Sequence, residues 1–498
     1  MKKTIVSAAL AALFVPALAS AADFTFSQEW TYNHALTGVA GQTSEISAFD
    51  TTTNSLWVVG IVGVDVLDAS TGSLLQHIDT TALGSVNSVA IYNGLAAFAI
   101  ESGADRTSAG TVQFYDTTTR ALSSGINSIA VGALPDMLTF TADGSKLLVA
   151  NEATPTTYGG FDPVGSVSII DMGTRTVAAT AGFTGVSTTG SYLRTNTGMD
   201  FEPEYITVNA AGTQAYVSLQ EANGMAVLDL TTNSFTSIIG LGAKDFSAAG
   251  NYIDPNDRDY ISGTSGPTKT ELRSVNVKGL YQPDGMAAYD VGGQTYIVMA
   301  NEGDTREDDG DKARASTISG TPTDAKRLNI STTDSTSGNL VMFGARSFSI
   351  RDASGSIVFD SGSELDAKAI ELGIYDDTRS DDKGVEPEGV ELITIGGRTL
   401  AFIGLERTLK SAVAVYDVTD PANASFLDML VTEGDIAPEG LMAYEKDGRF
   451  FIAISNEVSG TTTVYSMAPV PEPETYAMLL AGLGMVGFVA RRRNNRKA

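Results

Sequence analysis

Short segments in which apolar and polar residues alternate fill most of the chain. The clearest copy begins at Leu134-Pro135-Asp136 and continues through an apolar stretch at 137–140, a polar turn at 142–145 and a second apolar stretch at 146–150. A third apolar stretch follows at 165–171. Two-residue alternation interrupted by an Asp-Gly turn is typical of antiparallel strands. The pattern therefore predicts a β-meander.

The same pattern recurs along the chain at a spacing of roughly 40 to 80 residues. Four further copies open with a proline followed by an acid, namely at Glu202-Pro203-Glu204, Gln282-Pro283-Asp284, Glu386-Pro387-Glu388 and Ala437-Pro438-Glu439. Two weaker copies precede them at 44–68 and 87–116. Seven meanders without helical periodicity between them predict an all-β fold, a closed seven-bladed β-propeller, which leaves no long sheet edge exposed.

The predicted ring closes with strands from both ends of the chain. The seventh copy has three visible strands, the last at 463–467, and residues 24–32 alternate in the way a strand does, with Phe24, Phe26, Trp30 and Tyr32 on alternate positions. This segment is expected to complete the seventh blade. Three acidic, glycine-rich insertions, at 244–278, 303–338 and 362–384, interrupt the repeats and are expected to be loops over one face.

Both ends of the chain have the composition of targeting segments. Lys2 and Lys3 precede an apolar stretch at 5–18, and Ala19-Ser20-Ala21 has the small-residue pattern that signal peptidase cleaves, which predicts a helical signal peptide at 1–22 and a mature domain at 23–468. At the other end, 469–498, the order is Pro471-Glu472-Pro473, an apolar run at 476–490, and Arg491, Arg492 and Arg493. The run is shorter than the roughly 20 residues of an ordinary membrane span. It predicts a short transmembrane sorting helix whose basic end stays in the cytoplasm; a plain single-span anchor is the alternative.

Composition excludes several classes of function. The chain has no cysteine, so disulfides, thiolate metal sites and cysteine nucleophiles are excluded. Its formal net charge is −27, and becomes about −32 when the two basic ends are left out. Nucleic acid and anionic lipid are poor partners for such a surface. Cations are suitable partners, although an acidic surface also simply keeps an exported protein soluble.

The repeats bring acidic residues to one end of each blade. One acid precedes the first strand and another follows the second, and antiparallel neighbours place both at the same end. The mouth of one central funnel should therefore collect Asp136, Glu204, Asp284, Glu388 and Glu439 together with Glu152, Glu221, Glu302, Glu406 and Glu457. So many carboxylates cannot all remain ionised without cations, arginines or raised pKa values.

Calcium is the predicted cation, because the available ligands are hard oxygens and the two histidines, His34 and His77, are not spaced as ligands. The predicted metal ligands are Asp136, Glu204, Asp284, Glu302, Glu388, Glu439 and Glu457. The alternative is that the proline-acid pairs are structural turns. Acidic stretches at 254–259, 304–311 and 376–382 lack EF-hand spacing and are expected to be solvated loops.

Two arginines near the predicted mouth suggest a place for an anion. Arg306 and Arg407 follow Glu302 and Glu406 closely and are candidates for holding a phosphate or carboxylate, although arginines so placed also neutralise neighbouring acids. A serine-histidine nucleophile is not indicated, since no Gly-x-Ser-x-Gly segment is present. Any catalysis would use metal-activated water and a carboxylate base.

Particular phrases resemble known families. The copy at 134–171 looks like a YVTN-type propeller repeat, and the phrases 201–205, 282–287 with 300–304, and 386–389 resemble the choice-of-anchor I family. The first two copies depart from this pattern, with Glu45 and Ser88 at the position of the pair. The tail resembles the PEP-CTERM sorting signal, which an exosortase cleaves in Gram-negative bacteria that make extracellular polysaccharide.

These resemblances imply an exported protein of the outer surface or extracellular matrix, held transiently in the inner membrane by its tail. Signal peptidase and an exosortase-like enzyme are the expected processing partners, with extracellular polysaccharide or surface proteins as candidate ligands. No catalytic residue set accompanies the resemblance. We therefore expect a non-catalytic binding or structural protein with a cation-binding funnel. The alternative is a calcium-dependent hydrolase of phosphate esters or lactones.

Overall fold

The computed structural model describes residues 24–126, 128–157, 159–195, 201–306 and 310–470. By internal contacts the chain divides into two units, one of residues 27–466 and one of residues 1–26 with 467–498. The predicted signal peptide, its cleavage site and the predicted transmembrane sorting helix lie outside the described residues. Within the described ranges, no helix has the length and apolar character needed to cross a membrane.

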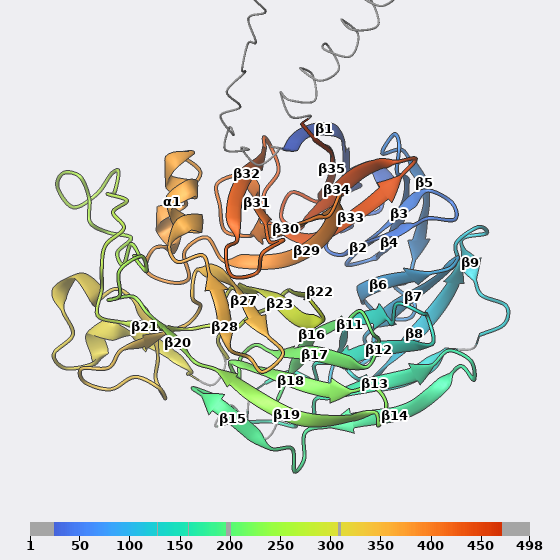
Figure 1. Cartoon of the computed structure of the whole chain (residues 1–498), viewed down its shortest axis with the longest axis horizontal. Coiled ribbons are helices and arrows are strands. Elements are labelled where there is room, and N and C mark those ends of the chain that lie inside the picture. Colours follow the sequence, from blue (N-terminus) through green and yellow to red (C-terminus); the bar gives the residue numbers. More distant parts are fainter. Residues whose placement is uncertain (1–23, 127, 158, 196–200, 307–309, 471–498) are drawn as a thin grey trace, which may run out of the picture. The chain divides into compact units, whose positions relative to one another are not determined.

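Seven sheets with four antiparallel strands each follow one another along the described chain, and two of them carry a fifth strand (Figure 1). The first three sheets contain β2 (Ser47–Asp50), β3 (Ser55–Gly60), β4 (Gly63–Asp68) and β5 (Leu74–Asp79); β6 (Val86–Tyr92), β7 (Leu95–Ile100), β8 (Ala109–Asp116), the short β9 (Ala121–Leu122) and β10 (Ile129–Ala133); and β11 (Pro135–Phe140), β12 (Lys146–Asn151), β13 (Ser166–Asp171) and β14 (Thr176–Gly182).

The remaining four sheets have the same plan. They contain β15 (Thr188–Ser191), β16 (Pro203–Val208), β17 (Gln214–Leu219), β18 (Gly224–Asp229) and β19 (Ser234–Leu241); β22 (Met286–Val291), β23 (Gln294–Asn301), β27 (Ser347–Asp352) and β28 (Ile357–Asp360); β29 (Pro387–Ile395), β30 (Arg398–Leu405), β31 (Ser411–Asp417) and β32 (Ser425–Thr432); and β33 (Pro438–Lys446), β34 (Arg449–Asn456), β35 (Thr461–Pro469) and β1 (Phe24–Asn33).

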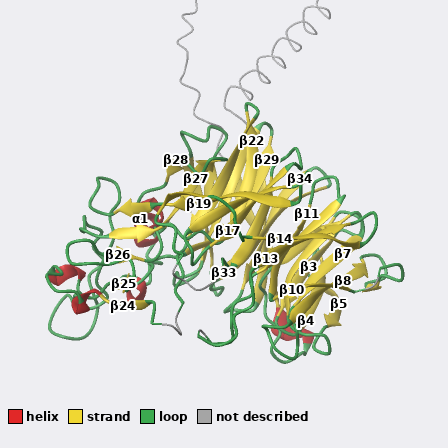
Figure 2. Ribbon diagram, turned by 90° about the horizontal axis from the view of Figure 1, so that it is seen from below, coloured by secondary structure: helices red, strands yellow, loops and turns green. Residues whose placement is uncertain are grey.

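The first strands of the seven sheets contact one another in a ring. β2 contacts β6, β6 contacts β11, and the contacts continue through β16, β22, β29 and β33 back to β2. Strands dominate the described chain, and its few helical segments are short (Figure 2). The predicted seven-bladed β-propeller is confirmed.

The seventh blade is completed by the N-terminal strand, because β1 pairs with β35. The hydroxyls of Thr31 and Thr463 lie 2.7 Å apart across this pair. In the smaller unit, the Thr25 hydroxyl donates to the main-chain oxygen of Ala468 at 3.3 Å. The alternation at 24–32 therefore identified the closing strand correctly.

Just after β1, a buried group of polar side chains joins the first and last blades. His34, in the single-turn helix η1 (His34–Thr37), lies with Nδ1 2.6 Å from Asp65 of β4 and Nε2 2.8 Å from the Thr462 hydroxyl of β35. His77 Nδ1 is 2.7 Å from the other Asp65 oxygen. The two histidines, which are far apart in sequence, thus share one fully buried carboxylate.

The exposed turn after the third strand of several blades is closed by an aspartate. The Asp171 carboxylate accepts the main-chain N–H and the hydroxyl of Thr174, and Asp68 does the same with Thr71. These bonds lower the pKa of Asp171. The Asp-x-x-Thr spacing explains the turn locally, because an aspartate side chain can accept from amides two and three residues ahead.

The three insertions are more ordered than the sequence predicts. They form two small sheets, β20 (Ala243–Asp245) with β21 (Lys278–Leu280) and β26 (Val341–Met342), and β24 (Lys312–Arg314) with β25 (Asn329–Ser331). They also contain η3 (Ala315–Thr317), η4 (Thr323–Ala325), η5 (Asp377–Arg379) and one α-helix, α1 (Glu364–Glu371).

The expectation that the insertions are loops is therefore wrong in part, because they contain short strands and helices. Apolar residues of the first two insertions, and of the stretch just after the second, pack into a core of their own, made of Phe246, Ile253, Val275, Val277, Ala315, Ala325, Leu328, Ile330, Leu340 and Met342. These residues show no regular period in sequence, because they come from two separate stretches of the chain that meet only in the folded protein. Their burial gives the insertions a hydrophobic reason to fold together.

Candidate functional site: an acidic mouth with paired and unpaired carboxylates

The proline-acid pairs lie at irregularities in the first strands. In β11 the pairing with β12 skips between Pro135 and Leu138, so Asp136 lies in a bulge between two regular stretches. The same skip follows Pro203, Pro387 and Pro438. A β-bulge redirects the side chains that it contains. The recurring sequence pair therefore corresponds to a recurring local geometry.

A second feature ties the two acids of a repeat together. The main-chain N–H of Glu152 donates to the oxygen of Leu134 at 2.9 Å, and Glu457 donates to Ala437 at 2.8 Å. Glu406 donates to Glu386 at 3.0 Å in the same way. A main-chain hydrogen bond thus holds the acid after the second strand beside the residue that precedes the proline. We call this acid-rich end of the propeller the acidic mouth. The name includes the acids that the repeats place there.

Three groups of carboxylates in the described chain are close enough to share a cation, with one oxygen from each member within 4.8 Å of the others. Group A is Glu152, Glu204 and Glu221; group B is Asp284, Glu302 and Glu388; group C is Glu302, Glu386 and Glu406. Glu302 belongs to both B and C. The three groups differ in how the protein compensates their charge.

Group C is compensated by basic side chains. Lys383 Nζ lies 2.7 Å from Glu302 and 2.9 Å from Glu386, and Arg379 Nη2 lies 2.5 Å from Glu386. Arg407 Nη2 lies 2.7 Å from Glu406. Burial alone would lower the pKa of Lys383, but Glu302 and Glu386 raise it well above its usual value. Group C is therefore a network of ion pairs.

Group B is compensated in part. Glu302 contacts Lys383 through one oxygen, and its other oxygen accepts from Gln220 Nε2 at 2.8 Å. Glu388 Oε2 is buried and has no hydrogen-bond partner among the described residues. Burial, with Glu406 next in importance, raises the pKa of Glu388 well above its usual value. Burial and Glu302 do the same for Asp284.

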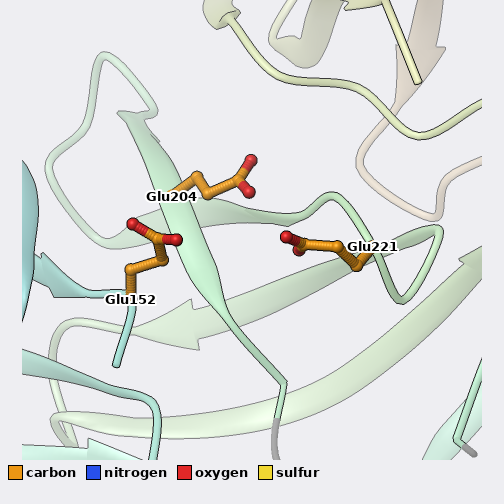
Figure 3. Close-up of side chains that lie close together, drawn as sticks. All are labelled: Glu152, Glu204 and Glu221. Atoms are coloured by element: carbon orange, nitrogen blue, oxygen red, sulfur yellow. The ribbon is translucent and has the colours of Figure 1, made fainter. Parts of the chain in front are cut away.

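Group A forms no ion pair with any described lysine or arginine. Figure 3 shows its three carboxyl groups approaching a common space from three sides. Glu204 is 9% exposed and Glu221 is 6% exposed, and the Oε2 atom of each is buried without a hydrogen-bond partner in the described chain. Glu152 accepts a hydrogen bond from the Thr154 hydroxyl. Burial raises the pKa of Glu204 well above the usual range, and the negative charge of Glu221 raises it further. Burial does the same for the pKa of Glu221, with the negative charge of Glu202 as the next cause.

The other predicted metal ligands lie in none of these three groups. Asp136 and Glu439 line a central cavity of about 260 Å³ together with Asp284 of group B. Burial raises the pKa of Asp136, and the negative charge of Glu152 adds to this. Burial also raises the pKa of Glu439, where the negative charge of Glu45 is the next cause. Glu457 is half-buried and acts on Glu439 through its charge. Calcium binding by these residues stays a prediction.

The two arginines expected to hold an anion have different surroundings. Arg407 is about two-fifths exposed and pairs with Glu406, while its Nε lies 4.0 Å from Glu386. Arg306 is buried, and its main-chain N–H lies 3.4 Å from an Asp311 oxygen. Anion binding by either residue stays a prediction, and Arg407 lies within the ion-pair network of group C.

The acidic stretches of the insertions are not the solvated loops that the sequence predicts. Asp254 is fully buried, and Asp257 forms a two-pronged ion pair with Arg327 at 2.6 and 2.7 Å. Asp381 also pairs with Arg327, at 2.9 Å, and with Arg314. The partners come from other insertions, so sequence spacing did not reveal them. In the stretch 304–311, residues 307–309 lie outside the described residues.

Several residues important to the acidic mouth were not identified from the sequence. Lys383 and Arg379 lie in the third insertion. Lys383 is about 80 residues from Glu302 along the chain. Glu386, the residue before Pro387, belongs to group C, whereas the repeat pattern drew attention only to the acid after the proline. Glu391 lines the central cavity. The only sign of this in the sequence was its position as the second residue of the alternating part of β29.

Comparisons with known proteins agree with this architecture. A family model for the choice-of-anchor I domain matches residues 45–421, and a model for the PEP-CTERM protein-sorting motif matches 469–493. No curated protein matches the chain. Among solved structures, the hydrazine synthase of Kuenenia stuttgartiensis is similar with 11% identity and a TM-score of 0.51, over 86% of this chain and 96% of that one. At this identity the likeness shows the fold alone.

The family match spans well over half of the chain and covers six of its seven first strands, including the bulges that carry Glu204 and Glu388. The sorting motif lies at the C-terminal end of the chain and implies processing by an exosortase-type system. Together these matches support an exported protein that is sorted to the surface of a Gram-negative type of envelope. The chain therefore belongs to the choice-of-anchor I domain family.

Proposed function

We propose that this protein is a non-catalytic, surface-displayed binding module that uses divalent cations, calcium above all, at the acidic mouth of its propeller to hold an acidic extracellular ligand such as a polysaccharide. One observation carries this proposal. Buried carboxylate oxygens of Glu204, Glu221 and Glu388 have no hydrogen-bond partner in the described chain. Such atoms are costly unless something neutralises them, and a cation does so most simply.

The charge of the whole chain supports a cation as intermediary. The formal net charge is −27, so an acidic ligand would be repelled by the bare protein. A bound calcium ion reverses the sign of the local field and offers open positions to carboxylate or hydroxyl oxygens. The ligand would then bind only when the ion is present.

A calcium-dependent hydrolase is the alternative function. It requires a cation with an open coordination position and an unengaged carboxylate beside it to act as a base. Group C offers no such base, because Lys383, Arg379 and Arg407 pair with its members. This pairing favours binding over catalysis, although Glu388 remains available as a base.

The test uses the full chain purified from membranes in detergent. It is passed over an immobilised polyuronate and over neutral dextran, each with calcium and with a chelator. We expect calcium-dependent retention on the polyuronate alone. In parallel, hydrolysis of a generic phosphate ester and a lactone is measured. Calcium-dependent turnover that disappears in Glu388→Gln would replace the binding function with the hydrolase. Absence of calcium binding would contradict both.

A further inference from the structure

We propose that Glu152, Glu204 and Glu221 form a calcium site at the junction of the third and fourth blades. This inference rests on the proposed function and deepens it, since it assigns the cation of the acidic mouth to one set of ligands. On this assignment the primary calcium ion binds at group A, and not at group B, at group C or in the central cavity.

The three ligands come from neighbouring strand ends that the fold holds in place. Glu152 follows β12 of the third blade, Glu204 lies in the bulge of β16, and Glu221 follows β17. One oxygen of each lies within 4.8 Å of the others. Two oxygens bound to the same calcium ion are at most about 5 Å apart, because each lies 2.3–2.6 Å from the metal. The observed spacing therefore suits calcium without rearrangement of the strands.

The protein does not neutralise this group in the way that it neutralises group C. The guanidinium of Arg194 approaches it, but Nη1 donates to the main-chain oxygen of Glu221 at 3.0 Å. The other nitrogens of Arg194 pair with Asp334, at 3.0 Å, and with Asp311. Glu204 and Glu221 are more than nine-tenths buried, and each has a carboxylate oxygen without a described partner. Their carboxyl groups face the common space of group A (Figure 3).

The ligand chemistry selects the class of ion. Three carboxylates without histidine or cysteine favour a hard cation over zinc or copper. Calcium accepts six to eight oxygens in flexible geometry, whereas magnesium demands a near-ideal octahedron at shorter distances. Three glutamates, some of them bidentate, would leave one or more positions for water or for an acidic ligand. This is the arrangement that a cation-mediated binding site needs.

The experiment measures ion binding directly in the full chain in detergent. Calcium is titrated by calorimetry, and terbium is titrated by its luminescence after excitation of tyrosine, since Tyr205 is adjacent to Glu204 in β16. The test variants are Glu204→Gln and Glu221→Gln. The matched control is Glu406→Gln, which removes a buried carboxylate of the same mouth from an ion-paired group.

We expect each test variant to weaken calcium binding at least about tenfold, as loss of groups around a metal site commonly does, and the control to change it by less than about threefold. Thermal unfolding checks that the variants are folded. In chelator, Glu204→Gln should melt no lower than the wild type, because it removes one of three crowded negative charges. With calcium, its gain in melting temperature should be smaller than that of the wild type.

The outcomes separate this site from the broader function. Calcium binding that is unchanged in Glu204→Gln and Glu221→Gln, but lost in Glu388→Gln, would overturn the site and leave the proposed function standing. A wild-type chain that binds neither calcium nor terbium would overturn both. Weakening in Glu406→Gln equal to that in the test variants would also overturn the assignment, because it would indicate a general effect of charge.

Discussion

At the scale of single residues, the same chemical group behaves differently according to its surroundings. Asp171 lies in an exposed turn, where hydrogen bonds from Thr174 lower its pKa. Glu391 lines the central cavity, as do the apolar side chains of Phe49 and Leu138, and burial raises its pKa to about 8, although a hydrogen bond from the main-chain N–H of Ala443 partly counteracts this. Desolvation therefore dominates in the cavity and hydrogen bonding dominates in the turns.

Glu391 should make the stability of the propeller depend on pH. Its pKa is raised in the folded state from 4.5 to about 8, so its contribution to stability is complete below pH 4.5 and is lost as the pH rises through 8. A tenfold difference in proton affinity between the folded and unfolded states corresponds to about 1.4 kcal/mol. We expect Glu391→Gln to lose less stability than the wild type between pH 5 and pH 9 in urea unfolding.

The control for this experiment is Glu433→Gln, at a side chain that is 78% exposed. Other buried acids contribute equally to wild type and variant, so the difference between the two proteins isolates Glu391. Parallel pH profiles for the wild type and Glu391→Gln would contradict the assignment of a raised pKa to this residue.

At the scale of elements, the ring depends on a single pairing between strands from the two ends of the chain. β1 pairs with β35, and the buried group of His34, Asp65 and Thr462 lies beside this junction. Each of the other six blades takes its described strands from one stretch of the chain, although an insertion separates β23 from β27. Among the described blades, only the seventh pairs strands that are more than 400 residues apart. Closing so long a loop carries a large entropy cost, which the hydrogen bonds and the buried core must offset.

A disulfide across the closing strands should stabilise the propeller. The chain has no cysteine, so Thr31→Cys with Thr463→Cys introduces one pair without competitors. The two hydroxyls lie 2.7 Å apart, which indicates side chains that face each other. We expect the oxidised double variant to gain about 2–4 kcal/mol of stability over its reduced form in denaturant unfolding.

The single variant Thr31→Cys serves as the control and should not respond to a reducing agent. If the double variant forms its disulfide, as shown by thiol counting, and yet melts at the same temperature in both redox states, opening of β1 does not limit the stability of the ring.

At the scale of the whole molecule, the chain combines an exported propeller with a sorting tail. The choice-of-anchor I match covers 45–421 and the sorting motif covers 469–493, and the last strand of the sixth blade and the three C-terminal strands of the seventh blade lie between them. The propeller is strongly acidic, whereas the tail ends in a basic cluster. Basic clusters of this kind are enriched at the cytoplasmic side of membrane-spanning segments, and the sequence predicts that this end of the tail stays there.

Replacing Pro471, Glu472 and Pro473 with alanine should block the cut without changing the propeller. We expect the variant to remain in the membrane fraction at its uncut mass, because the processing enzyme reads this motif. Gel mobility measures the mass of the variant, and cell fractionation measures its location. Glu474→Ala, at the next position, is the control. A variant that is still cut and released would show that the motif is not what the enzyme recognises.

Much of the fold was predictable because its signals are local. Alternation at 24–32 identified β1, and the proline-acid pairs marked the starts of first strands, since bulges and turns depend on adjacent residues. The insertions were misjudged for the opposite reason. Phe246 packs with Ala315 and Met342 although it comes from a different stretch of the chain, and no period in the sequence connects them.

The sequence by itself determined the blade number, the closing strand and the crowding of acids at one end, because each follows from patterns of neighbouring residues. Only the tertiary structure decided which carboxylates are neutralised. Lys383 of the third insertion reaches Glu302, which directly follows β23, while Glu204 and Glu221 have no ion pair in the described chain. Charge compensation depends on distance in space, which packing sets and which spacing along the chain does not encode.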